Sequence, residues 1–237
     1  MPDTDPSELE QRLHYNPGAN PAIVVAAPHH GYQKGCDFYT KEFATILATQ
    51  LEASLLVADS LRPLVDLNKE PSRAATPELQ RLCLTYQEHA LADPVKLLLE
   101  IHGHIHGHYG LELSCGFRLD PGNSIDQDTG NALRCLESSL SMEIERRWQS
   151  WYPLPAPTIG IFPDNQQVVM KATQTFLFQK IRSLQLQGRR IFGLHIEVYR
   201  DYKTSDQNSP LAACQQSLAE ALAAGISESF SSALIKL

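Results

Sequence analysis

The 237-residue sequence lacks long apolar runs, blocks of basic residues and paired cysteine motifs. Its apolar runs are shorter than the roughly 18 residues that cross a bilayer, and its polar, acidic start does not have the layout of a signal peptide. With 20 basic and 27 acidic residues the formal charge is −7, which argues against nucleic acid as the main partner. Five cysteines without a CxxC pair favour neither a disulfide framework nor a thiolate zinc site. We therefore expect a cytoplasmic protein that binds neither membranes nor nucleic acid.

What the sequence does contain is an alternation of apolar and amphipathic segments. Strands are expected at residues 21–28, 54–59, 96–102, 110–116 and 190–200. The spacing of apolar residues predicts helices at 37–51, 77–92, 130–148, 165–186 and 208–237, the last one interrupted at Gly225. This alternation predicts an α/β fold, a three-layer αβα sandwich with a mostly parallel, mixed central sheet. A hydrophobic content of 43% without a long linker predicts one domain over residues 1–237, in which residues 1–20 are a lead-in segment with a short helix at 7–14.

Histidines alternate with other residues directly after the strand at 96–102: His102, His104, His106 and His108. In an extended strand this spacing places all of them on one face. Residues two apart lie about 6.6 Å from each other, so one metal ion could bind a neighbouring pair at most. The alternative is a surface cluster that has no role.

Polar residues also gather where other predicted strands end. One strand runs directly into His29 and His30, a second is followed by the polar segment 60–69, and a late strand carries His195 and Glu197 on one face. In open α/β sheets, ligands bind at the carboxyl ends of the strands. A catalytic zinc ion takes three histidine or carboxylate ligands and leaves one position open. The combination indicates a metal-dependent hydrolase.

The motifs APHHG (27–31), LRPLVDLNK (61–69), EIHGH (100–104) and HIEVYR (195–200), with Asp37 after the first of them, occur in this order. Together they resemble the ordered motifs of the N-formylglutamate amidohydrolase family, which shares its fold with the zinc carboxypeptidases. The resemblance extends over about residues 23–202. It implies the same fold for this chain and a hydrolytic activity on carbon–nitrogen bonds.

For the metal, the resemblance implies one Zn²⁺ ion, or another divalent transition metal, with His29 and His102 as ligands. The third ligand is a carboxylate that follows the first histidine, and Asp37 is the best match. Glu100 and His104 are alternatives for this third position. His30 occupies a variable position of the motif and is an accessory candidate.

For catalysis, the resemblance implies that Glu197 is the general base. The residues support this role independently, because a lone carboxylate in an apolar strand is costly unless it is partnered or functional. The alternative is a structural ion pair with Arg200. Arg62 is the candidate that polarises the scissile carbonyl or binds a substrate carboxylate, since a guanidinium can donate to two oxygens. His195 is either part of the same pocket or a core histidine.

Substrate-binding candidates besides Arg62 are Asn68, Lys69 and Arg200, with Arg118 as a further one. The sequence departs from the family at Lys69, where arginine is usual, and lysine does not form the bidentate contact. We expect a zinc-dependent amidohydrolase that acts on a small N-formyl or N-acyl amino acid or peptide-like substrate, with an acidic group. Alternatives are a carboxypeptidase-like or γ-glutamyl-peptide hydrolase on the same scaffold, and a metal-binding protein without catalysis.

Overall fold

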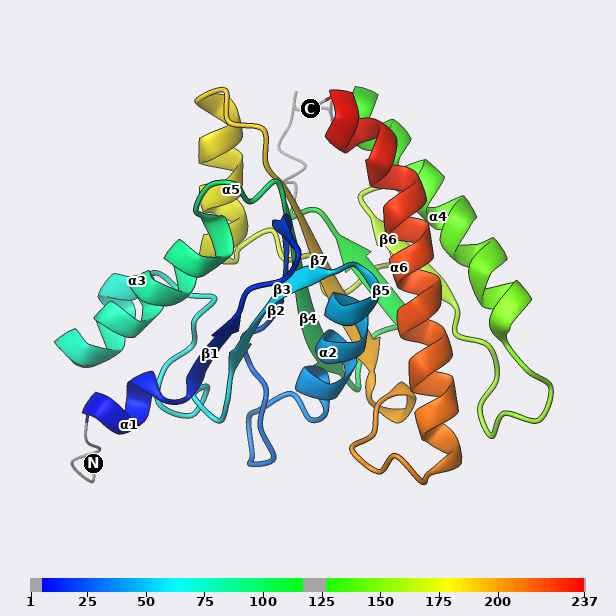
Figure 1. Ribbon diagram of the computed structural model, residues 1–237, viewed down its shortest axis with the longest axis horizontal. Coiled ribbons are helices and arrows are strands. Elements are labelled where there is room, and N and C mark those ends of the chain that lie inside the picture. Colours follow the sequence, from blue (N-terminus) through cyan, green and yellow to red (C-terminus); the bar gives the residue numbers. More distant parts are fainter. Residues whose placement is uncertain (1–5, 117–126, 237) are drawn as a thin grey trace.

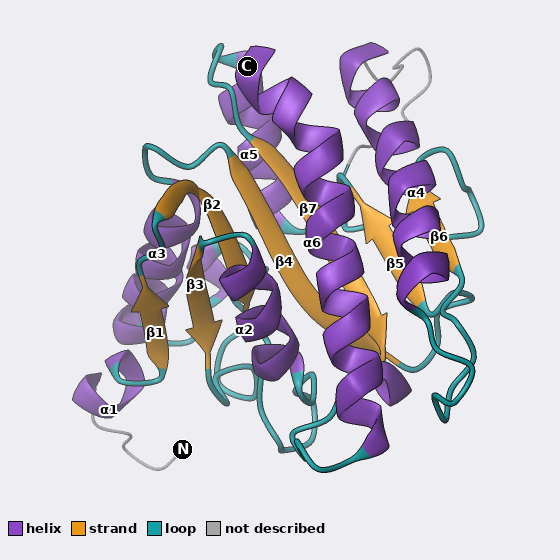
Figure 2. Cartoon of the chain, turned by 45° about the vertical axis from the view of Figure 1, so that its right-hand side comes forward, coloured by secondary structure: helices purple, strands orange, loops and turns teal. Residues whose placement is uncertain are grey.

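The computed structural model describes residues 6–116 and 127–236 and contains a seven-stranded sheet between two layers of helices (Figures 1 and 2). The strands are β1 (Leu13–Asn16), β2 (Asn20–Ala27), β3 (Ala53–Ala58), β4 (Leu97–His104), β5 (Leu111–Ser114), β6 (Ile159–Phe162) and β7 (Phe192–Tyr199). The helices are α1 (Pro6–Glu10), α2 (Thr40–Gln50), α3 (Pro77–Leu91), α4 (Gln127–Arg147), α5 (Phe176–Leu186) and α6 (Pro210–Lys236). Two short 3₁₀ turns, η1 (Pro71–Arg73) and η2 (Arg200–Tyr202), complete the described elements.

The strand order is β1-β3-β2-β4-β7-β5-β6. The central strands β3, β2, β4 and β7 run parallel, as do β5 and β6, while β1 and β5 run antiparallel to their neighbours β3 and β7. Helices α2, α4 and α6 pack on one face of the sheet, and α3 and α5 on the other. The predicted α/β sandwich with a mostly parallel, mixed sheet is therefore confirmed.

Three details differ from the sequence-based expectation. Residues 13–16 of the expected lead-in form the edge strand β1, because Leu13 and Tyr15 pack against the core on the α3 side. Residues 163–175 form a loop rather than the start of a helix, since the side chain of Asn165 accepts a hydrogen bond from the backbone of Gln167 and favours a turn. Helix α6 continues through Gly225, where the absence of a side chain allows close contact with Leu140 of α4.

The register of the central strands creates one polar face. His102 lies opposite Glu197 and Glu100 opposite His195 in the β4–β7 pair. Strand β5 adds Glu112 opposite Glu197 from the other side. Opposite residues in paired strands project from the same face, so these side chains share it. The residues between them are apolar and project into the core beneath α2, α4 and α6, among them Ile101, Leu113 and Ile196.

No helix within residues 6–116 and 127–236 is both long and apolar enough to cross a membrane.

Candidate functional site

Three buried side chains converge at the carboxyl ends of β2 and β4. The loop after β2 leaves the sheet at His29 and returns at Asp37, whose backbone N–H donates to the His29 carbonyl at 2.8 Å. This bond brings the Asp37 carboxylate beside His102 of the adjacent strand. Asp37 Oδ2 lies 3.1 Å from His102 Nδ1 and 3.6 Å from His29 Nδ1. These three atoms all lie within 4.8 Å of one another.

The geometry of this cluster, His29, Asp37 and His102, fits a metal ion. Two ligands of a tetrahedral zinc ion lie about 3.4 Å apart when each bond is about 2.1 Å, close to the separations of Asp37 from the two histidines. His29 Nδ1 is buried and has no hydrogen-bond partner within the described residues. A metal ion would satisfy this atom, because neutral imidazole nitrogen and carboxylate oxygen are the ligands that zinc prefers.

A second set of groups orients the side chains of this cluster. His29 Nε2 lies 2.8 Å from Asp66 Oδ1, and Arg62 Nη1 donates to Asp37 Oδ1 at 2.8 Å. His102 Nε2 lies 3.2 Å from the side-chain amide of Asn68. With the outer nitrogens engaged in this way, both imidazoles present Nδ1 to the shared centre. Metal-ligating histidines are commonly held by carboxylate or carbonyl partners of this kind.

Replacement of Asp66 by asparagine is expected to weaken metal binding about 10- to 100-fold. The carboxylate holds the ring of His29 and makes Nδ1 a better ligand, whereas an amide supplies the contact without the charge. Competition with a chromogenic chelator measures the affinity. The matched control is the same change at Asp201, D201N, because Asp201 pairs with Arg200 rather than with a residue of the cluster. An unchanged zinc affinity in D66N would contradict the orienting role.

In the absence of a metal ion, the charges around the cluster disfavour the neutral form of the His102 imidazole. Burial alone would lower the pKa of His102, but hydrogen bonds to Asp37 and Glu100 and the charge of Glu197 outweigh burial and raise it to about 10. Burial likewise favours a protonated Asp37, yet contacts with His102 and His29 hold the pKa of its carboxyl well below the usual range. The metal-free cluster is therefore an ionised carboxylate beside a protonated imidazole.

Because His102 binds a proton in the metal-free state at pH values below about 10, metal binding must release that proton. Zinc affinity is therefore expected to increase with pH, by up to about tenfold per unit for each proton released. Calorimetric titrations in two buffers of different ionisation enthalpy count the released protons. A binding enthalpy that is independent of the buffer would contradict this expectation.

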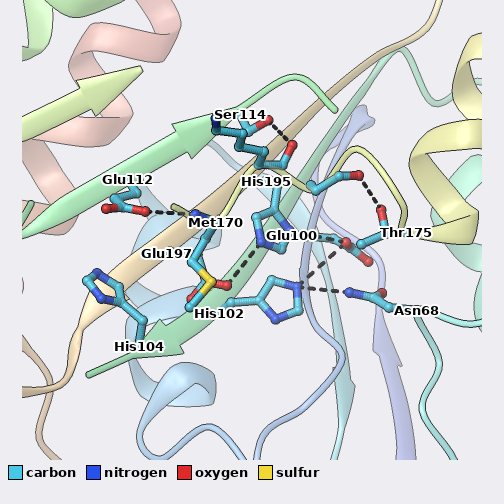
Figure 3. Close-up of polar contacts among 12 residues, drawn as sticks. Asn68, Glu100, His102, His104, Glu112, Ser114, Met170, Thr175, His195 and Glu197 are labelled. Carbon is cyan, nitrogen blue, oxygen red and sulfur yellow. Dashed lines mark hydrogen bonds and ion pairs between the residues drawn. The ribbon is translucent and has the colours of Figure 1, made fainter. Parts of the chain in front are cut away.

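Beside the metal cluster lies a buried chain of polar residues (Figure 3). Glu197 Oε1 lies 3.1 Å from His195 Nε2, and its second oxygen, Oε2, has no partner within the described residues. Glu100 is fully buried and accepts a hydrogen bond from the Tyr86 hydroxyl at 2.8 Å. Its other oxygen lies 3.6 Å from His102 Nε2 and 3.9 Å from His195 Nδ1. The candidate general base thus lies next to the candidate metal ligands.

Burial would raise the pKa values of both glutamates of this chain. Contacts with His102 and His195 reverse the effect for Glu100 and lower its pKa to about 2. The hydrogen bond from His195 likewise keeps the pKa of Glu197 below its usual value. Both carboxylates are therefore ionised at neutral pH, and Glu197 is able to accept a proton.

The structure also brings Arg62 and Asn68 to this site. The Arg62 side chain is 35% exposed although one of its nitrogens is paired with Asp37. Asn68 is buried against His102. Lys69 is exposed.

Several other sequence candidates lie apart from the metal cluster. Arg200 is exposed and pairs with Asp201. His30 is turned toward the start of α2, where its Nδ1 accepts the backbone N–H of Lys41. His104 is buried on the polar face, and its Nδ1 accepts the N–H of Gly107. The remaining histidines of the row, His106 and His108, are exposed because β4 ends at His104. Arg118 lies outside the described residues.

Two charged residues near the site, Glu112 and Lys203, were not predicted from the sequence. Glu112 is fully buried, and its carboxylate accepts three backbone N–H bonds, from His108, Val169 and Met170, which joins two loops beside the polar face. A lone carboxylate in an apolar strand, the signal used for Glu197, would have found it. Lys203 gave no such signal, because it follows η2 among other polar residues.

Lys203 is nonetheless buried against the end of β4. Its ammonium donates to the Val198 carbonyl at 2.7 Å, and a methyl group at Gly103 would lie 2.5 Å from Nζ. Burial lowers the pKa of Lys203 to about 8, against the charges of Asp37 and Glu197. The lysine is therefore a counter-charge near the two carboxylates, and a side chain at position 103 would require its ammonium to move.

No protein-family model matches the chain, and no curated protein sequence matches it significantly. Among solved structures, the N-formylglutamate amidohydrolase from Ralstonia eutropha JMP134 is similar at 13% identity and a TM-score of 0.55, over 89% of this chain and 95% of that one. A looser match is a bacteriophage poly-gamma-glutamate hydrolase, with 10% identity and a TM-score of 0.47 over 88% of this chain and 86% of that one. Another is a metallo-carboxypeptidase from Burkholderia cenocepacia, with 13% identity and a TM-score of 0.49 over 93% of this chain and 61% of that one. The chain thus has the fold of an N-formylglutamate amidohydrolase, as the sequence motifs implied.

Proposed function

We propose that this chain is a zinc-dependent amidohydrolase that cleaves the amide bond of a small N-formyl or N-acyl amino acid, or of a peptide-like substrate. The observation that carries the proposal is the arrangement of two groups of buried residues. One is the cluster of His29, Asp37 and His102, in which one imidazole nitrogen has no hydrogen-bond partner among the described residues. The other is Glu197, a neighbouring carboxylate, one oxygen of which has no hydrogen-bond partner within residues 6–116 and 127–236. A merely structural site has no need for either unsatisfied atom.

Zn²⁺ bound by His29, Asp37 and His102 would supply a Lewis acid for the substrate carbonyl and lower the pKa of a water molecule. Glu197 accepts the proton of the attacking water at its free oxygen and returns it to the amide nitrogen as the carbon–nitrogen bond breaks. Arg62 donates from its exposed N–H groups to the carbonyl oxygen, where negative charge develops, or to a carboxylate of the substrate. The buried surroundings strengthen each of these interactions.

The preference for an acidic substrate rests on Arg62, because this guanidinium is the cation that the structure places beside Asp37 with part of its surface exposed. Asn68 contributes by holding His102 rather than by direct contact with the substrate. Lys69 and Arg200 lie outside the ligand cluster, and we propose them as contacts for a distal anionic group of a longer substrate.

The test is a hydrolysis screen of the zinc-loaded protein against N-formyl, N-acetyl and N-succinyl amino acids, γ-glutamyl peptides and unmodified dipeptides. Release of the free amine from an acylated amino acid is expected, with loss on treatment with a chelator and recovery on addition of zinc. Cleavage of only γ-glutamyl peptides or C-terminal residues would favour the alternative hydrolases on this scaffold. The proposal fails if zinc is bound and none of these substrates is cleaved.

A further inference from the structure

The ring of His195 is held on both sides by other rings. It lies 4.2 Å from the ring of His102 and 5.8 Å from that of Phe178, measured between centroids. Phe178 reaches this position because Gly193 and Gly116 leave it space, since a Cβ at either glycine would come within 3.0 Å of its ring or Cβ. The orientation of the imidazole is therefore determined by packing before any substrate binds.

This orientation engages one specific oxygen of Glu197. His195 and Glu197 project from the same face of β7, and the contact between Nε2 and Oε1 measures 3.1 Å. Within the described part of the chain, the second oxygen of the carboxylate has no hydrogen-bond partner although it is buried. The contact thus restricts the carboxylate to one rotamer and leaves one oxygen available for the reaction.

Glu100 faces the other nitrogen of the His195 ring at ion-pair distance rather than at hydrogen-bond distance. Glu100 Oε2 lies 3.9 Å from His195 Nδ1, and Oε1 is bound by the Tyr86 hydroxyl of α3. Tyr86, Glu100 and His195 are all buried. Tyr86 on α3, Glu100 on β4 and His195 on β7 therefore follow one another toward Glu197, with hydrogen bonds at the two ends and a longer ion-pair contact between Glu100 and His195.

We propose that His195, oriented by the packing of its ring and by the nearby charge of Glu100, is a positioning residue for Glu197, and that its contact determines which oxygen of Glu197 faces the substrate. The inference rests on the proposed function, in which Glu197 is the proton acceptor. It adds a role for His195 and Glu100 that the metal cluster does not require.

The competing interpretation is a second metal position. The ligand atoms of Glu100, His102 and His195 also lie within 4.8 Å of one another, and Glu100 Oε2 and His195 Nδ1 have no hydrogen-bond partner among the described residues. Two ions would then share His102, which would have to bind through both nitrogens at once and lose both N–H protons. His102 already directs Nδ1 to Asp37, so we assign Glu100 and His195 to positioning.

The test uses two amides that imitate different parts of the imidazole. H195Q retains an N–H donor near the place of Nε2, whereas H195N retains one only near Nδ1. H195N is expected to lower kcat about 100-fold with little change in KM, because a displaced catalytic group costs about that factor. The kcat of H195Q is expected to be at least about tenfold higher than that of H195N. The zinc content of both variants is expected to equal that of the wild type. H106Q, in the exposed part of the histidine row, is the matched control.

A crystal structure of each metal-free variant supplies a readout that needs no activity. Glu197 is expected in a single rotamer in the wild type and H195Q and in several in H195N. A single rotamer in H195N, or equal kcat values for H195N and H195Q, would overturn the positioning role. A wild-type content of two zinc ions that falls to one in both variants would instead establish the second metal position. If the wild type binds zinc but cleaves nothing, the proposed function fails while the rotamer comparison still decides the role of His195.

Discussion

Replacement of Glu197 by glutamine is expected to lower kcat about 1,000-fold while zinc content stays unchanged. General acid–base catalysis by a positioned side chain contributes about 10²- to 10⁴-fold, and glutamine preserves the shape of the side chain but cannot accept the proton. The carboxylate is not part of the cluster formed by His29, Asp37 and His102, so metal binding should not depend on it. Steady-state kinetics together with elemental analysis of the purified variant measure both quantities.

The matched control is E143Q, the same chemical change in α4, where Glu143 pairs with Arg146 and Arg147 away from the sheet. Its kcat is expected to equal that of the wild type. If E197Q retained full turnover, the proton acceptor would have to be another group. If E197Q lost zinc as well as turnover, Glu197 would be a ligand, and its assignment as base would be wrong.

The histidine positions of the site were accessible from the sequence. His29 and His102 follow directly from apolar strands, and the carboxyl ends of adjacent parallel strands meet at one edge of a sheet. Periodicity also predicted that His195 and Glu197 would share a face. For these residues the local pattern determines the position, because each side chain lies within or next to a regular element.

Asp37 could be assigned only through the family resemblance. It lies in the loop between β2 and α2, and a tertiary hydrogen bond to the His29 carbonyl returns it to the sheet edge. Spacing along the sequence contains no information about such a bond. The same holds for Lys203, which reaches the site through space left by Gly103.

The alternating histidines show the limit of a periodic pattern. Period 2 places side chains on one face only while the strand lasts, and β4 ends at His104. Beyond this residue the glycine-containing loop exposes His106 and His108. Of the four histidines in the row, only His102 therefore lies in the cluster with His29 and Asp37.

Replacement of the two candidate histidine ligands, His29 and His102, by alanine is expected to abolish specific zinc binding. Asp37 would be the remaining ligand of the cluster, and one carboxylate does not hold zinc at micromolar concentrations. Zinc at about 1,000 times its Kd stabilises the folded wild type by about 4 kcal/mol. Addition of zinc should therefore raise the Tm of the wild type clearly and leave that of the double variant unchanged.

The matched control is the replacement of His106 and His108 by alanine, because these two belong to the same row and are exposed. Zinc content and the zinc-dependent rise in Tm should be preserved in this variant. In the reverse result, the exposed pair is needed for zinc binding and the buried pair is not. The chain would then be a protein that binds metal through the exposed histidines of the row. The buried cluster would then bind no metal, and the proposed hydrolysis, which requires a metal ion beside Glu197, would be wrong. One pair of double variants therefore separates the enzymatic from the non-catalytic interpretation before any substrate is known.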